Sequence, residues 1–480
     1  MCSTELGKGY WSSEGSAGCD LAAEGFYLST QKRTPKPEPC PNGVACEKAG
    51  TTTQSMELTD GWFKFAAQSV EVYKCPYENC VAPAHNASGA VGPDLCAKGS
   101  SGPLCAVCDP DHYLSKQKNA CQACSKGNGW LGPVVGLAMI FVVGAALVRY
   151  KSKLSAFATR NQAWLARLSQ RAILFLIFLQ IITVLKGNHD NMDGAKAMAE
   201  PYKTYLSIVS VVDLDLTQLL PLNCMSADSF DHFNVLLATT LVPLGAALVL
   251  LFVVLVLKRG SQAAIEKEFV QVLLFAYPAI SRTICQSFRC SEFDDGSNDV
   301  LKYLTADMSI DCADGRYVGT VAFASLCLLI YSVGIPLGLF FKLWKWRHAL
   351  NPPGYEDEAR ATRARLKDKR MLAEPLVIFA IKFRPWCWWY EVYTLCRRFL
   401  LTSLVLAFPT LESYTVYVLS VATCALLLDR EWVPHVDAYA SAFNHALNAQ
   451  VLLAPMVGWG GWGGGGGGRG GVLCKERQAW

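Results

Sequence analysis

Residues 96–148 read CAKGSSGPLCAVCDPDHYLSKQKNACQACSKGNGWLGPVVGLAMIFVVGAALV, and the join within this stretch decides the fold. Its first part carries five cysteines, and its second part, from Trp130, is an almost unbroken apolar run. The five are Cys96, Cys105, Cys108, Cys121 and Cys124. Disulfide bonds form in oxidising compartments, whereas a run of about 20 apolar residues requires a bilayer. The join therefore predicts an extracytoplasmic cysteine-rich region followed by helices in a membrane.

The composition agrees with a membrane protein. Hydrophobic residues make up 52% of the 480 residues, charged residues make up 18%, and the net charge is only +4. Soluble proteins carry about 25% charged residues. So small a net charge gives no indication of nucleic acid as a partner. Residues 1–5 lack the basic and apolar parts of a secretory signal, so we expect the natural N-terminus to lie further upstream.

Residues 1–127 are predicted to form a small, disulfide-rich and loop-dominated region. Eleven cysteines lie among Gly, Pro, Ser and Asn residues, with few apolar runs that could form a core. The spacing does not give the pairing. Zinc remains an alternative, because Cys105-x2-Cys108 and Cys121-x2-Cys124 have zinc-ribbon spacing, but an exported location favours disulfides. The sequon at Asn86 also suits an exported loop.

The cysteine-rich stretch resembles a known module. The pattern C-x-x-G-x-x-G-P-x-C-x-x-C from Cys96 to Cys108, followed by Tyr113 and a final C-x-x-C, is similar to the GCC2/GCC3 repeat. This EGF-like repeat is also called the ephrin-receptor-like module, and the resemblance covers about residues 75–124. It implies a spacer or an interaction surface for an extracellular protein or glycan, and it implies no catalysis.

Apolar segments within residues 128–457 predict an all-α polytopic transmembrane helix bundle. They lie near 130–148, 170–186, 233–257, 269–288, 318–341, 388–408, 414–428 and, most weakly, 438–457. Residues 202–222 are also apolar, and we predict an outer-face or re-entrant helix there, with a further full span as the alternative. The glycine-rich residues 458–480 are expected to be disordered or an artefact of the gene model.

Basic residues indicate the cytoplasmic side. They are concentrated in 149–171, 258–267 and 342–370, whereas 291–315 is acidic. The positive-inside rule therefore places the N-terminus on the extracytoplasmic side of the plasma membrane or an endomembrane. Cys290 and Cys312 then lie outside, and their pairing is the one that we favour. The basic segment 342–370 also favours membrane lipid as a partner.

Charged residues inside apolar segments mark candidate sites, because a charge in a bilayer is unfavourable. Asp213 and Asp215 are candidates for a cation vestibule, although residues two apart on a helix do not share a face. The alternative is that both lie at the water boundary of an interfacial helix.

A second set comprises Glu391, Arg397 and Arg398. We expect each to meet a partner on a neighbouring helix; alternatively, the two arginines extend to cytoplasmic headgroups. Pro278 and the segment 334–336 predict helix kinks.

The order of short motifs along residues 130–458 carries a second resemblance. It comprises Phe178-Leu-Gln180, Leu214-Asp-Leu, Pro221-Leu-Asn-Cys224, Tyr277-Pro278, Val333-Gly-Ile-Pro336, Trp389-Tyr-Glu391 and Pro434-His435. This order is similar to the TRP C-terminal-domain family of algal and protist membrane proteins. The resemblance implies a TRP-like cation channel, which would form a homo-oligomer, although several members have been linked to flavin or calcium handling.

Two other functions remain open: a receptor or adhesion protein without conduction, and a small-molecule transporter. No catalytic motif, cofactor site or metal site is indicated, so we do not expect an enzyme.

Overall fold

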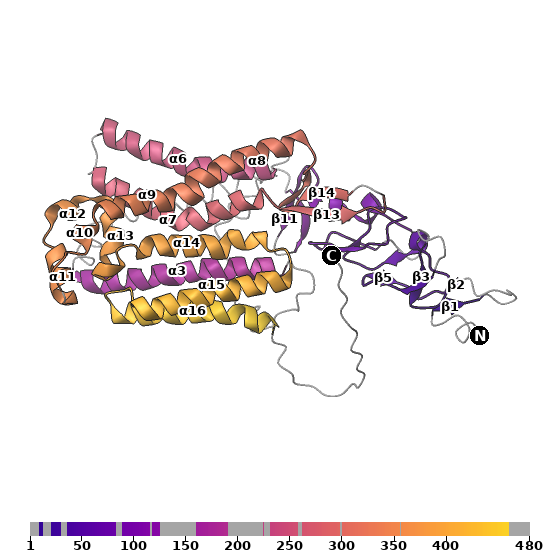
Figure 1. Cartoon of the computed structure of the whole chain (residues 1–480). Helices are drawn as coiled ribbons and strands as arrows, with labels where there is room; N and C mark the ends of the chain where they lie inside the picture. Colours follow the sequence, from indigo (N-terminus) through magenta and orange to yellow (C-terminus); the bar gives the residue numbers. More distant parts are fainter. Residues whose placement is uncertain are drawn as a thin grey trace, which may run out of the picture.

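The computed structural model describes residues 9–12, 21–29, 36–82, 89–115, 118–124, 160–190, 224, 231–257, 262–297, 300–355 and 357–459. A region of short strands lies at one end, and long helices lie side by side through the rest (Figure 1). Several predicted features fall outside the described residues: the first span at 130–148, the segment 202–222 with Asp213 and Asp215, the sequon at Asn86, and residues 460–480.

The N-terminal region consists of short antiparallel hairpins. They pair β1 (Tyr10–Trp11) with β2 (Leu21–Ala22), β3 (Phe26–Leu28) with β4 (Pro37–Pro39), β5 (Val44–Ala45) with β6 (Glu57–Leu58), β7 (Trp62–Phe63) with β8 (Tyr73–Lys74), β9 (Ser100–Ser101) with β10 (Val107–Cys108), and β11 (His112–Ser115) with β12 (Ala120–Ala123). A two-stranded hairpin alone is marginally stable in water. Cross-links are therefore needed to hold this region together.

Disulfide bonds supply those cross-links. They join Cys40 to Cys46, Cys75 to Cys80, Cys96 to Cys105, Cys108 to Cys121, Cys124 to Cys224, and Cys290 to Cys312. All four cysteines of the zinc-ribbon pattern are thus in disulfides, which leaves them no thiolate for the zinc alternative. The bond from Cys124 reaches 100 positions along the chain and ties the end of this region to the helical part.

The C-terminal part is mainly helical. Its helices are α3 (Gln162–Asp190), α6 (His232–Leu257), α7 (Gln262–Gln286), α8 (Gly315–Cys327), α9 (Gly334–Lys345), α10 (Arg347–Leu350), α11 (Glu358–Arg365), α12 (Lys369–Ala373), α13 (Ile378–Ile381), α14 (Tyr390–Thr402), α15 (Leu411–Trp432) and α16 (Ala438–Trp459). A π-helical turn, η7 (Leu328–Val333), joins α8 to α9 without a break. Among the described residues, three helical stretches are long and apolar enough to cross a membrane: Arg167–Asn188, Gly315–Lys345 and Leu411–Trp432.

Helix α14 lies between two groups of helices (Figure 1). On one side it shares an apolar core with α3, α15 and α16, to which Phe178, Leu401 and Val418 contribute. On the other side it packs with α7 and α9, where Tyr277, Leu343 and Leu395 are buried. A third core joins α6, α7 and α8. Side chains of α14 can therefore contact both groups.

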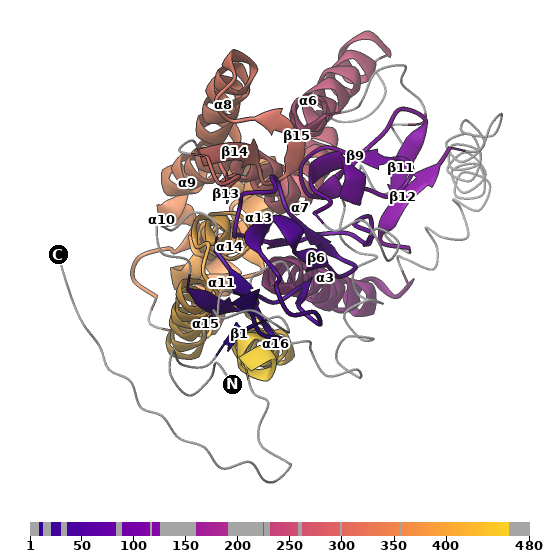
Figure 2. The same ribbon diagram turned by 90° about the vertical axis from the view of Figure 1, so that its right-hand side faces the viewer.

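The acidic segment after α7 is not a simple loop. It forms an antiparallel sheet of β13 (Cys290–Asp294), β14 (Val300–Leu304) and β15 (Asp307–Asp311), so the part predicted to be all-α contains a sheet. Phe293 of β13 is buried in the core of the cysteine-rich region, with its ring centre 5.1 Å from those of Phe65 and Tyr73. Figure 2 looks onto this end and shows the sheet beside α6 and α8.

Candidate functional site: proline breaks joined across the helices

Prolines inside the helices create buried polar groups that need partners. Pro243 lies in α6, Pro278 in α7 and Pro336 in α9. A helical proline lacks the N–H that would bond to the carbonyl four residues earlier. A carbonyl left unpaired in an apolar environment is destabilising, so each break needs a donor from elsewhere.

Arg398 supplies the donor for the break in α7. Pro278 frees the carbonyl of Leu274, and Nη1 of Arg398 donates a hydrogen bond of 3.0 Å to that oxygen. Nη2 donates to Gln180 Oε1 on α3 at 3.1 Å and to the Phe275 carbonyl at 3.4 Å. Arg398 is 3% exposed. One guanidinium from α14 therefore holds α7 and α3 together.

Tyr277, next to Pro278, supplies the donor for the break in α9. Pro336 frees the carbonyl of Ser332, and the Tyr277 hydroxyl donates a hydrogen bond of 2.8 Å to it. The Ser332 hydroxyl also donates to Ser281 Oγ on α7, at 3.0 Å. Ser332 lies in the π-helical turn η7, and such turns are frequent at functional sites.

Tyr331, next to Ser332, binds the third helix. Its hydroxyl donates to the Thr240 carbonyl of α6. Pro243 frees the carbonyl of Thr239, so this contact lies one residue away from the break in α6 and does not supply its donor. We call Arg398, Tyr277, Tyr331 and the Leu274, Ser332 and Thr240 carbonyls that they bind the proline relay. It runs from α14 through α7 and η7 to α6, and all three donor side chains are buried. The relay therefore links α14, α7, η7 and α6 through successive buried hydrogen bonds.

A buried polar cluster lies on the other face of α14. Arg397 Nη1 donates to Asn448 Oδ1 at 2.8 Å and lies 3.9 Å from Asp429 Oδ2. Asp429 also accepts hydrogen bonds from the Tyr390 hydroxyl, the Asn448 amide and, at 2.9 Å, Asn444 Nδ2. These contacts connect α14, α15 and α16 through buried polar groups next to their apolar core.

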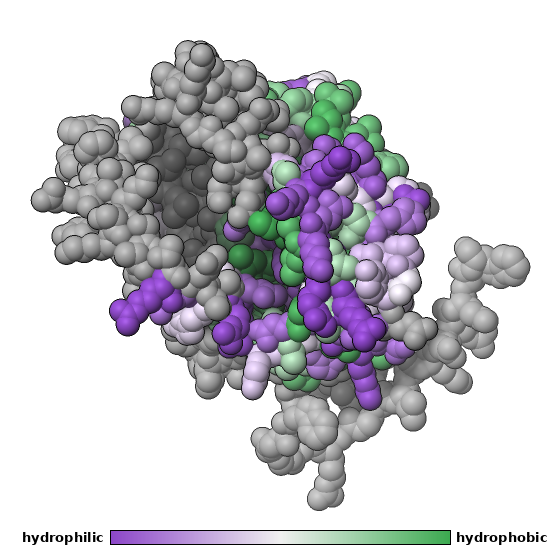
Figure 3. Space-filling view, turned by 90° about the vertical axis from the view of Figure 1, so that its left-hand side faces the viewer, coloured by the Kyte–Doolittle hydropathy of each residue, from purple (hydrophilic) through white to green (hydrophobic). Residues whose placement is uncertain are grey.

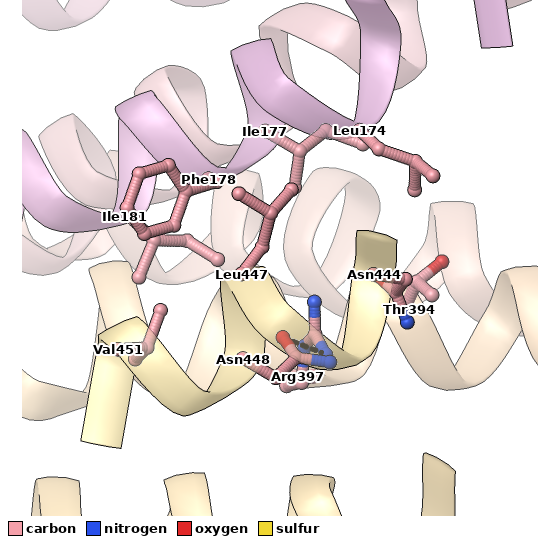
Figure 4. Close-up of a pocket in the computed structure, with 10 residues that line it drawn as sticks. All are labelled: Leu174, Ile177, Phe178, Ile181, Thr394, Arg397, Asn444, Leu447, Asn448 and Val451. Carbon is pink, nitrogen blue, oxygen red and sulfur yellow. Dashed lines mark hydrogen bonds between the residues drawn. The ribbon is translucent and has the colours of Figure 1, made fainter. Parts of the chain in front are cut away.

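A small cavity adjoins this cluster (Figure 4). It has a volume of about 20 Å³, and its lining residues are Leu174, Ile177, Phe178, Ile181, Thr394, Arg397, Asn444, Leu447, Asn448 and Val451. A cavity of this size holds about one water molecule. Arg397 Nε has no hydrogen-bond partner in the described structure, so a water at this wall would satisfy it.

The three charged residues that the sequence marked as candidates, Glu391, Arg397 and Arg398, thus have different partners. Glu391 forms an ion pair of 2.7 Å with Lys382, which precedes α14. Arg397 and Arg398 point to opposite helix groups and are buried, so the alternative that they extend to headgroups is wrong. Sequence reasoning did not identify Asp429, because it lies near the end of an apolar span. Tyr277 and Tyr331 were also not singled out, although the Tyr277-Pro278 pair was a signal.

Comparison with known proteins covers only a small part of the chain. Cysteine repeat modular protein A of Toxoplasma gondii is 37% identical over 87 residues, which is 17% of this chain. The chain spans about 3% of the length of that protein. No family model and no solved structure matches. The class that these findings define is a cysteine-rich, disulfide-bonded region joined to a helical part with apolar helices.

Proposed function

We propose that this chain is a polytopic membrane protein of the TRP-like, cation-channel type, in which an extracytoplasmic cysteine-rich region controls the helices. The observation that carries the proposal is the position of the β13–β15 sheet. Phe293 of this sheet belongs to the core of the cysteine-rich region, and β15 is followed within four residues by α8, which continues into η7 and the proline relay. An event at the cysteine-rich region therefore has a short covalent path to the relay.

Membrane insertion is supported by the three apolar helical stretches and by the difference in composition between the two ends of the molecule. The cysteine-rich region lies at one end, and the basic helices α10, α11 and α12 lie at the other (Figure 1). This separation agrees with the positive-inside rule if the cysteine-rich end is extracytoplasmic. Val318, Leu329 and Phe341 are more than 60% exposed, as expected for side chains that face lipid or another copy of the chain.

Polar contacts at the outer end strengthen the path to the helices. Asp307 of β15 accepts a 2.8 Å hydrogen bond from the backbone N–H of His232, the first residue of α6. Asp231 accepts from Asn234 N at 3.1 Å at the start of the same helix, and its other oxygen pairs with Arg316 of α8. A displacement of the sheet would therefore move the ends of α6 and α8 together. Those helices lead to Thr240 and Tyr331, the last pair of the relay.

Cation conduction is tested with purified full-length protein in liposomes loaded with a calcium indicator. We expect calcium entry above that of empty liposomes, and the combined Asp213→Asn and Asp215→Asn substitutions should reduce its selectivity over monovalent cations. Substitution of Glu412 and Glu431 by glutamine is the charge-matched control. Folded protein that supports no flux would contradict the channel proposal.

A receptor or adhesion protein is the second candidate, with an extracellular protein or glycan as the ligand. It is favoured by the match to a cysteine repeat protein, which covers 17% of this chain. We propose no enzymatic activity, and a transporter has no specific observation in its favour.

A further inference from the structure

The end of the molecule opposite the cysteine-rich region carries a basic surface. Figure 3 views this end and shows hydrophilic side chains in a ridge beside hydrophobic ones. We define the basic end as exposed Lys345 of α9, Arg363 of α11, and Lys367, Lys369 and Arg370 around the start of α12, with Leu366 and Leu372. All these residues lie between the end of α9 and the start of α13.

Among the described residues, these cations differ from their neighbours in having no acidic partner. Lys342 lies 3.5 Å from Glu374, and Arg360 lies 3.7 Å from Asp357. Among the residues that the structure describes, no carboxylate lies within ion-pair distance of the five cations of the basic end. Their positive field is therefore available to an external anion.

Two leucine side chains are exposed on the same surface. Leu366 is 48% exposed and Leu372 is 42% exposed, although each is next in sequence to a buried residue, Arg365 and Met371. The backbone here is fixed, because Asp368 caps α12 through the N–H groups of Arg370 and Met371, at 3.0 and 3.1 Å. Exposed leucines among unpaired cations are unfavourable in water but suit the boundary between lipid headgroups and acyl chains.

Arg365 anchors this surface to the helical domain. Its Nη2 donates a hydrogen bond of 2.8 Å to the Ile381 carbonyl, at the end of α13. Close by, Trp344 on the last turn of α9 is 46% exposed, and the Arg347 guanidinium lies 4.4 Å from its ring centre. Tryptophan is enriched at membrane interfaces, so the end of α9 gives the expected level of the bilayer surface.

We infer that the basic end binds the anionic headgroups of the cytoplasmic leaflet, with Leu366 and Leu372 entering the apolar boundary. The inference rests on the proposed membrane insertion and orientation, and it does not depend on conduction. Each cation near an anionic leaflet strengthens binding by about fivefold. The basic end would thereby fix α11 and α12 against the membrane and, through Arg365, hold α13 in place.

The test uses full-length protein in nanodiscs of phosphatidylcholine with increasing amounts of phosphatidylserine. Amide hydrogen exchange is followed in residues 357–373. We expect exchange to slow as phosphatidylserine is added. The triple variant Lys367→Gln, Lys369→Gln and Arg370→Gln should lower the apparent affinity for phosphatidylserine on the order of 100-fold. Leu366→Gln with Leu372→Gln should reduce the protection that remains at high salt, where the charge contribution is screened.

A matched control removes three exposed cations at the other end, through Lys36→Gln, Lys48→Gln and Lys98→Gln, and should leave the exchange of residues 357–373 unchanged. Exchange that is insensitive to phosphatidylserine in the unmodified protein would overturn the inference. So would equal protection by inorganic phosphate added to phosphatidylcholine nanodiscs, because it would show a site for free anions. If the protein supports no cation flux but the exchange of residues 357–373 still slows with phosphatidylserine, the proposed channel function is contradicted and the lipid inference stands.

Discussion

At the scale of single residues, Arg398 is a charged side chain buried between helices. A buried guanidinium is unfavourable unless its N–H groups find acceptors. Nη1 and Nη2 of Arg398 find them on α7 and α3, and one acceptor is a carbonyl that Pro278 leaves free. The charge and the proline break therefore compensate for each other. Lysine could not do the same, because its ammonium lacks the planar fork of donors.

We predict that Arg398→Leu lowers the free energy of unfolding by about 2–4 kcal/mol, because it leaves the Leu274 and Phe275 carbonyls and the Gln180 amide without their donor. Arg398→Lys should recover only part of this loss. The measurement is thermal and denaturant unfolding of the full-length protein in detergent. Arg360→Leu, on the surface of α11, is the control and should stay within about 0.5 kcal/mol. A similar small effect for Arg398→Leu would show that the guanidinium is dispensable.

His435 is a second residue with a testable environment. It lies in the turn between α15 and α16, where Gln170 Nε2 lies 3.2 Å from His435 Nδ1, within hydrogen-bond distance. Burial, assisted by the positive charge of Lys382, lowers the pKa of His435 from 6.5 to about 4. In the folded protein the imidazole therefore stays neutral down to about pH 4, whereas in the unfolded chain it gains a proton near pH 6.5.

The sign of the pH effect follows from this difference. Between pH 6.5 and 4 the unfolded state binds more protons than the folded state, so stability falls as the pH falls through this window and levels off below it. We expect a loss of up to about 3 kcal/mol, which His435→Gln should remove from the pH profile. Exposed His348→Gln is the matched control. An unaltered pH profile in His435→Gln would refute this assignment.

At the scale of the elements, the proline relay supplies the hydrogen-bond donors that the breaks in α7 and α9 require. Tyr277 is next to Pro278, whose break frees the carbonyl that Arg398 binds. Tyr331 is next to Ser332, whose carbonyl accepts a hydrogen bond from Tyr277. Each tyrosine therefore adjoins in sequence the preceding contact of the relay. The π-helical turn η7 rotates the helix by one extra residue and brings Ser332 and Tyr331 to different neighbours. A straight α8–α9 helix would not present both side chains in this way.

A double-mutant cycle tests the relay at Pro336. Tyr277→Phe should lower the free energy of unfolding by about 1–2 kcal/mol, because the Ser332 carbonyl loses its donor. In a Pro336→Ala background the loss should be smaller by about 1 kcal/mol, since the introduced alanine restores an N–H that reaches the same carbonyl. Exposed Tyr439→Phe should have no effect in either background. Additive losses would mean that the Tyr277 hydroxyl does not serve the proline break.

The sequence indicated part of this arrangement. It marked kinks at Pro278 and 334–336 and selected Arg397 and Arg398 as candidates. It could not connect them, because Arg398 lies 124 positions from Leu274 and Tyr277 lies 55 from Ser332. Spacing rules relate residues within one helix only. The β13–β15 sheet was not predicted either. The many acidic residues of 291–315 are typical of an exposed loop, and they hide the strand-like pattern around Phe293 in Ser291–Asp294.

At the scale of the whole molecule, the cysteine-rich region shares a core with the β13–β15 sheet of the C-terminal part, so the two parts are not independent units. Ser69 Oγ donates to the Asp294 carbonyl at 3.1 Å, and the Asp294 N–H donates to the Tyr73 hydroxyl at 2.7 Å. With Phe293 and the disulfide from Cys124 to Cys224, these contacts join the two parts at several points. The sequence placed a domain boundary near residue 127 and gave no indication that a later segment returns to the first part.

The proposed orientation in the membrane predicts where glycans are added. Asn86 should be glycosylated in cells, and Asn86→Gln should abolish the glycosidase-sensitive shift in mobility. A new sequon made by Tyr355→Asn with Asp357→Ser, before α11, should stay unmodified, because in the proposed orientation that end faces the cytosol. A serine at this position can still cap α11, so folding is preserved. Glycosylation at position 355 would contradict the proposed orientation.

In the proposed function, the cysteine-rich region controls a cation pathway through the β13–β15 sheet. Single-channel recording of the full-length protein in planar bilayers tests it most directly, with Phe293→Ala compared with the unmodified protein and with Val300→Ala, an exposed position in the same sheet. We expect a cation-selective current whose open probability changes in Phe293→Ala, with conductance unchanged, and is unaffected in Val300→Ala. No current from the folded protein, or identical gating in all three, would contradict it.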